Sequence, residues 1–140
     1  MLNIEMPDDL ISLSLFNIFS YRKKDKKFIK HVSDWNKKIV LHISPFYPVV
    51  VIFQGTTIRF EKNYDENADL KVKIDINTML DIAYGRINPF DVMNEGKMEI
   101  EGLGEDSSMI VKFYNVFVDS MIMIAADPNI KYYELNKETR

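Results

Sequence analysis

Glycine and proline positions between residues 85 and 102 constrain the local fold of this chain more tightly than any other feature of its sequence. Asn88 is a favourable N-cap, and Pro89 suits the first helical position because its missing N–H has no helical partner to lose there. Gly96 suits a left-handed residue at the end of a short helix. The alternating apolar and charged residues that follow predict a half-buried strand over 97–101.

A second short helix is predicted immediately upstream. Asp75 is a plausible N-cap and Gly85 a plausible stop signal, so the helix occupies the residues between them. Its apolar positions fall at helical spacing: Ile76, Met79, Leu80 and Ala83. Two short helices are therefore expected between two strands.

Apolar alternation predicts four further strands, over residues 38–44, 49–53, 56–62 and 68–75. The second of them is apolar at every position, which is typical of a central strand covered on both faces. Short connections favour antiparallel pairing for most of the sheet.

Helical patterns lie at both ends of the chain. The N-terminal region 7–36 is predicted to be helical, as one bent helix or as two. An apolar helix over about 106–126, capped by Asp106 or Ser107, has only a narrow polar stripe. The apolar face of this helix is wider than packing on one side of a sheet requires, so the apolar side chains that do not contact the sheet need a second partner. The tail 127–140 is either docked or loose.

Composition limits the classes of function. The 140 residues suit one domain, taken as 1–140, and the net charge of −3 argues against a dedicated nucleic-acid binder. The chain has no cysteine, and its two histidines lie far apart, so we expect no metal and no cofactor. No apolar run approaches the ~20 residues of a membrane-spanning helix, and a cytoplasmic location is expected.

The order of these motifs resembles the sterol carrier protein type 2 family. The resemblance rests on Asn67-Ala68-Asp69 before a strand, on Gly85-Arg86 followed by Pro89, and on the strand motif Gly96-Lys97-Met98-Glu99-Ile100-Glu101-Gly102. One departure is the absence of the aspartate that often follows the last motif glycine. The resemblance implies an α+β fold with a five-stranded mixed, mainly antiparallel sheet covered by helices and enclosing an apolar tunnel. It also implies binding and intracellular transfer of a fatty acyl, isoprenoid or sterol-like lipid without catalysis.

Twelve apolar or aromatic side chains are the candidates for the tunnel lining: Ile52, Phe60, Ile74, Leu80, Tyr84, Phe90, Met93, Met98, Ile100, Phe113, Phe117 and Met121. Flexible methionines suit a surface that must fit varied apolar ligands. Arg59 and Arg86 are candidates for binding a carboxylate or phosphate head group, because guanidinium pairs with such groups through two hydrogen bonds.

Other interpretations stay open at this stage. The same apolar residues would form an ordinary core or a homodimer interface, and the chain would then be an interaction module for an enzyme of lipid or quinone metabolism. A basic segment, formed by Arg22, Lys23, Lys24, Lys26 and Lys27, would either contact an anionic membrane or be a solvated connection between helices. No catalytic Ser/His/Asp order, paired carboxylates or phosphate loop stands out, so no enzyme is predicted.

Overall fold

The computed structural model describes residues 1–102 and 108–130. Its framework is a six-stranded mixed sheet in the order β1-β4-β3-β2-β5-β6. The strands are β1 (Asn3–Ile4), β2 (Lys38–Ser44), β3 (Pro48–Gln54), β4 (Thr57–Glu61), β5 (Leu70–Asp75) and β6 (Met98–Glu101). The pairs β1–β4 and β2–β5 are parallel, and the remaining three pairs are antiparallel.

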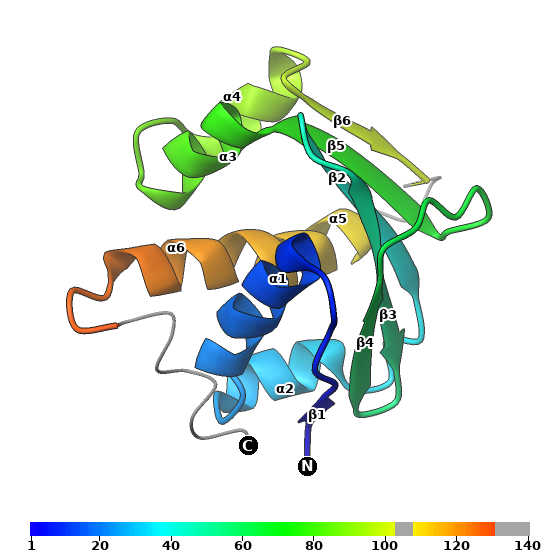
Figure 1. Ribbon diagram of the computed structural model, residues 1–140. Helices are drawn as coiled ribbons and strands as arrows, with labels where there is room; N and C mark the ends of the chain where they lie inside the picture. The colour runs from blue at the N-terminus through cyan, green and yellow to red at the C-terminus, as the bar shows by residue number, and fades with distance from the viewer. Residues whose placement is uncertain (103–107, 131–140) are drawn as a thin grey trace.

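The helices lie together on one side of this sheet (Figure 1). They are α1 (Leu10–Tyr21), α2 (Lys26–Val32), α3 (Ile76–Ala83), α4 (Pro89–Asn94), α5 (Ser108–Phe113), a π-helical turn η1 (Tyr114–Val118) and α6 (Asp119–Ala126). The last three form one continuous rod, which packs against α1, α2 and α3. In Figure 1 this rod crosses the middle of the molecule, with α3 and α4 above it and α2 below.

The predicted α+β fold with a mixed sheet covered by helices is confirmed, with one more strand than expected. The additional strand is β1, whose two residues pair in parallel with Thr57 and Ile58 of β4. Two residues are too few to show an alternating pattern. The N-terminal region forms two helices, because the Asp25 carboxylate caps a new helix by accepting from the Lys27 N–H at 2.9 Å.

The predicted helix signals at residues 75–96 act as expected. Asp75 and Asn88 cap α3 and α4 by accepting backbone N–H bonds of 2.9 and 2.8 Å. Gly85 and Gly96 both have φ of +72°, the left-handed conformation that ends a helix at low cost only for glycine. Local chemistry therefore keeps both helices short. The expected caps Asp106 and Ser107, and the tail beyond residue 130, lie outside the described residues.

The main core fills the space between the sheet and the helices. Phe19, Phe53 and Phe117 meet at its centre, with ring centroids 5.3 to 6.3 Å apart. Strand β3 is buried at every position from Val49 to Phe53, as predicted for a central strand. The opposite face of the sheet carries a second, small cluster of Val40, Val50 and Ile52, against which Ala68 packs.

The expectation that no apolar segment reaches membrane-spanning length was wrong. Within the described residues, the helical rod Ser108–Ala126 is long and apolar enough to cross a bilayer by length and composition alone. Its side chains Met109, Phe113 and Val116 are buried in the main core. Core helices of globular proteins pass the same length test, and 39% of the tested window is buried inside this protein.

Candidate lipid-binding site

An apolar cavity lies inside the main core, between the sheet, α1, α3 and the C-terminal rod. We refer to it as the inner cavity, and its volume is about 20 Å³. It is lined by Leu15, Ile18, Phe19, Leu41, Val72, Ile74, Met79, Ile82, Met98, Phe113, Phe117, Val118 and Met121. Because every one of these side chains is apolar, the inner cavity offers nothing to hold a water molecule.

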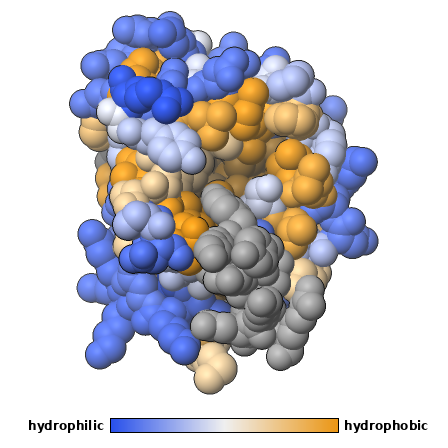
Figure 2. Space-filling view, turned by 60° about the vertical axis from the view of Figure 1, so that its left-hand side comes forward, coloured by the Kyte–Doolittle hydropathy of each residue, from blue (hydrophilic) through white to orange (hydrophobic). Residues whose placement is uncertain are grey.

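A larger cleft of about 290 Å³ opens to the surface beside the inner cavity. This outer cleft is lined by Ile18, Met79, Leu80, Ala83, Tyr84, Met121, Ile124, Ala125, Asp127 and Ile130. Figure 2 shows hydrophobic surface surrounding a hollow on the side of the molecule where α3 and α6 lie. Ile18, Met79 and Met121 line both spaces and so separate the outer cleft from the inner cavity.

The two volumes differ in what they can hold. Ligand pockets usually measure about 300–1,000 Å³, so the outer cleft is near the lower limit and the inner cavity is far below it. A lipid chain in the inner cavity therefore requires side chains to move. Met79 and Met121 stand between the two spaces, and methionine changes conformation at low cost.

Asp127 is the only formally charged side chain among the described residues that line the outer cleft. Its carboxylate accepts the Asn129 N–H at 2.9 Å and the Tyr21 hydroxyl at 2.8 Å. These hydrogen bonds hold the pKa of Asp127 below its usual value, and the bond to Asp127 raises the pKa of Tyr21. The cleft therefore carries a carboxylate, not a carboxylic acid, at neutral pH.

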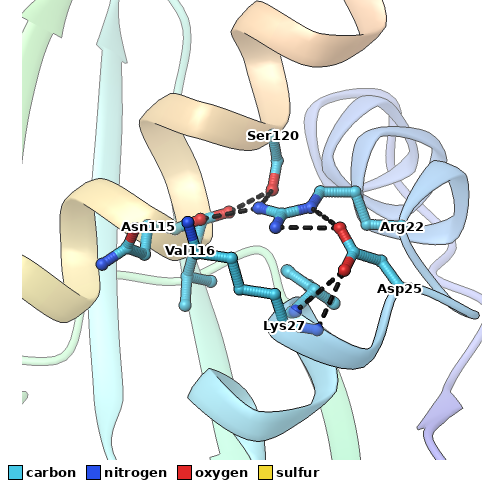
Figure 3. A network of polar contacts seen from close by, with 7 residues as sticks. Arg22, Asp25, Lys27, Asn115, Val116 and Ser120 are labelled. Carbon is cyan, nitrogen blue, oxygen red and sulfur yellow. Dashed lines mark hydrogen bonds and ion pairs between the residues drawn. The ribbon is translucent and has the colours of Figure 1, made fainter.

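Arg22 lies inside the protein, so it belongs neither to a membrane contact nor to a solvated connection, the two alternatives for the basic segment. Its side chain is only 3% exposed. The guanidinium pairs with Asp25 at 3.1 Å and donates to the Asn115 carbonyl at 2.8 Å and to the Ser120 hydroxyl at 3.1 Å (Figure 3). Arg22 thus joins the α1–α2 connection to the C-terminal rod. The lysines of the segment are partly or fully exposed.

These contacts hold the part of the rod that lines the inner cavity. The turn η1 contains Phe117 and Val118, both lining residues, and Asn115, whose carbonyl accepts from Arg22. The Ser120 hydroxyl in turn donates to the Val116 carbonyl at 2.6 Å. Single π-helical turns inside α-helices are frequent at functional sites.

A model of the SCP-2 sterol transfer family matches residues 16–118. The chain belongs to this family. Its domains are generally non-catalytic modules that bind and transfer lipids. A comparison with curated protein sequences finds no significant match.

Solved structures of the family share the fold. A UbiJ-SCP2 ubiquinone synthesis protein superimposes with a TM-score of 0.58 at 18% identity, covering 89% of this chain and 99% of that one. Sterol carrier protein domain 2 of Helicoverpa armigera gives 0.56 at 16% identity, covering 92% and 99%. A crystal structure of sterol carrier protein 2 gives 0.51 at 17% identity, covering 79% and 94%. At these identities the likeness establishes the fold alone.

Two motifs by which the chain resembles the family meet in the structure. The Asp69 carboxylate accepts the Lys38 N–H at 2.9 Å and so connects the start of β5 to β2. Gly102 follows β6 with φ of +101°, and a Cβ at this position would overlap the Asp69 carbonyl oxygen. Asp69 and Gly102 therefore stabilise the packing of β2, β5 and β6 in the sheet, and neither residue lines the inner cavity or the outer cleft.

Of the twelve predicted lining residues, seven line the inner cavity, the outer cleft or both. Five of them surround the inner cavity: Ile74, Met98, Phe113, Phe117 and Met121. Leu80 and Tyr84 line the outer cleft, which Met121 also reaches. These seven residues come from β5, β6, α3 with its C-cap, and the C-terminal rod, which the fold brings together.

The other five predicted residues lie elsewhere. Phe60, Met93 and Ile100 pack against the main core without lining either space. Phe90 is exposed and stacks on Tyr114, with ring centroids 5.0 Å apart. Ile52 was assigned to the wrong face of the sheet, because a run that is apolar throughout does not reveal which side chains point inward.

The predicted head-group contacts are also corrected. Arg59 pairs with Ile52 across β4 and β3, and so belongs to the sheet face opposite the helices. Arg86 forms an ion pair with Asp81 at 2.7 Å and lines neither space. Neither guanidinium is therefore positioned for a ligand in the cleft.

Several lining residues were not predicted from the sequence. Leu15, Ile18 and Phe19 belong to α1, and Met79 and Ile82 belong to α3. Their signal was helical apolar spacing, which does not distinguish a cavity wall from a filled core. Asp127 had a clearer signal, as an acidic residue directly after a long apolar helix and before a proline. Within the described residues, no group of His, Cys, Asp and Glu side chains is arranged to hold a metal ion.

Proposed function

We propose that this protein binds one lipid, of fatty acyl, isoprenoid or sterol-like type, and transfers it between sites without chemical change. The apolar chain enters through the outer cleft between α3 and α6, and its far end occupies an enlarged inner cavity. Each buried methylene contributes about 0.8 kcal/mol, so a long chain reaches useful affinity with few polar contacts.

The observation that carries the proposal is the continuity of the apolar lining. Ile18, Met79 and Met121 belong to three different helices and border both spaces. Movement of the two methionines would join a surface cleft of about 290 Å³ to the centre of the core. Membership of the SCP-2 family supports lipid binding by this chain.

The test is displacement of a neutral fluorescent lipid, pyrenyldodecanol, from the purified protein. Met121→Trp should weaken binding at least tenfold, because the indole would fill the junction of the two spaces. Met123→Trp is the matched control, since Met123 is 40% exposed on the same helix and lines neither space. Equal affinities of the two variants, at equal thermal stability, would contradict the proposal.

Lipid extracted from the freshly purified protein gives an independent measurement. Native mass spectrometry should detect a bound chain at near-unit occupancy, and the extract would identify its class. An apo protein that also fails to accelerate transfer of pyrenyldodecanol between vesicles would reject the carrier function.

A second candidate function is that of an accessory module for an enzyme of lipid or quinone metabolism. It is favoured by the likeness, over 99% of its length, to a protein described as a ubiquinone synthesis protein. The Met121→Trp and Met123→Trp pair separates the two functions. An accessory module without a ligand would show no lipid binding in the wild type or in either variant, and Met121→Trp would disturb association with the partner.

A further inference from the structure

Three helices end at the outer cleft. The last turn of α1 contributes Ile18, the end of α3 contributes Leu80 and Ala83, and the end of α6 contributes Ile124 and Ala125. The C-terminus of a helix carries partial negative charge, because its last carbonyl groups point along the axis without helical partners. These helix ends therefore add partial negative charge near the opening, although the last α3 carbonyls, of Leu80, Asp81 and Ile82, accept the N–H groups of Tyr84, Arg86 and Gly85.

Asp127 adds a full negative charge at the same place. Its two hydrogen bonds, from Asn129 and Tyr21, use two of the roughly four acceptor positions of a carboxylate. Acceptor capacity therefore remains on a side chain that lines the cleft.

None of the described side chains that line the cleft carries a positive charge. The lysines of the basic segment are not among the described residues that line it. Arg86 lies over the Tyr84 ring at 5.4 Å, but its guanidinium is paired with Asp81 at 2.7 Å. Within the part of the lining that the structure describes, the polar side-chain groups are the hydroxyl of Tyr84 and the carboxylate of Asp127.

From this arrangement we infer that the outer cleft selects lipids whose head group donates a hydrogen bond, an alcohol or an amine, over lipids that carry a carboxylate, with Asp127 as the specificity-determining residue. The inference rests on the proposed function and names its substrate class. A fatty acid would bring a second carboxylate to Asp127 and to three helix C-termini. An alcohol would donate to Asp127 instead.

The experiment compares three ligands with one chain: oleyl alcohol, oleylamine and oleate, each displacing pyrenyldodecanol from the full chain at pH 8. Two charges about 4 Å apart repel by about 1 kcal/mol in water, which is about fivefold in affinity. The wild type should therefore bind oleyl alcohol and oleylamine at least fivefold more tightly than oleate. Asp127→Asn should raise the affinity for oleate and remove most of this difference.

Asp119→Asn is the matched control, because Asp119 also belongs to α6 but lines neither space, and it should keep the wild-type preference. Tight binding of all three ligands without preference, or a preference unchanged by Asp127→Asn, would overturn this inference and leave lipid binding intact. Failure of all three to displace the probe would overturn the proposed function together with it.

Discussion

The guanidinium of Arg22 donates a hydrogen bond of 2.8 Å to the backbone carbonyl of Asn115, which lies 93 residues later in the chain. The same side chain is held against the Phe28 ring, at 4.9 Å from its centroid, and pairs with Asp25. One buried cation therefore ties the first two helices to the π-helical turn beside the inner cavity.

Replacement of Arg22 should strongly destabilise the protein. Arg22→Met removes the partner of Asp25 and of the Asn115 carbonyl, so we expect a loss of about 2–4 kcal/mol in the free energy of unfolding. Urea denaturation checks this value. Lys24→Met, at an exposed position of the same segment, should change stability by less than about 0.5 kcal/mol. Similar losses in both variants would contradict the structural role of Arg22.

Stability should depend on Asp25 at acid pH. Burial alone would raise the pKa of Asp25, but hydrogen bonds from Arg22 and from the Lys27 N–H lower it below 3.8. Because the folded state binds the proton less readily than the unfolded state, the stabilisation is complete above the unfolded pKa and is lost as pH falls through the folded pKa. Unfolding free energies at pH 7 and pH 3 should therefore differ less in Asp25→Asn than in the wild type.

Gly102 should tolerate no side chain. Gly102→Ala places a Cβ against the Asp69 carbonyl at a φ of +101°, so the end of β6 must shift. We expect a loss of about 2–3 kcal/mol. Gly96→Ala has a φ of +72° but meets nothing within 4 Å, and should cost about 1 kcal/mol. Thermal unfolding of the two variants distinguishes steric overlap from backbone strain.

The lysines of the basic segment either contact an anionic membrane or form a solvated connection, and vesicle binding distinguishes the two. Lys23 and Lys24 follow Tyr21, whose hydroxyl bonds Asp127 at the outer cleft, so a membrane bound here would lie near the cleft. Each lysine near such a surface contributes about 1 kcal/mol. Replacing Lys24, Lys26 and Lys27 by glutamine should weaken sedimentation with phosphatidylserine vesicles by at least tenfold and leave binding to neutral vesicles unchanged. Equal sedimentation would show that the segment is only a solvated connection.

Local signals in the sequence were sufficient for most of the fold. Asn88, Gly85 and Gly96 act through hydrogen bonds and dihedral angles of their own neighbourhood, so their roles could be predicted without knowledge of the tertiary structure. The all-apolar run of β3 was correctly assigned to a central strand. Its inward and outward faces could not be told apart, because that distinction depends on the neighbouring strands.

The errors at Arg22 and Asp127 have the same origin. Arg22 looked like one more cation of a basic segment, and its burial depends on Asn115 and Ser120, far away in sequence. Arg86 is neutralised by Asp81, five residues before it, which was a signal that sequence alone contained. Asp127 lines the cleft only because α1, α3 and α6 come together around it in the folded protein.

The π-helical turn affects the direction of every side chain that follows it. The hydrogen bonds of η1 run from residue i to residue i+5, where those of an α-helix run from i to i+4. The rod therefore contains one residue more than a regular α-helix that follows the same path. Each residue of an α-helix turns the next side chain by about 100°. Phe113 and Met121 are eight residues apart, so on a regular α-helix of the present sequence they would point about 80° apart, and Met121 would turn away from the junction of the two spaces. The irregularity is what allows one helix to present Phe113 and Met121 to the same interior.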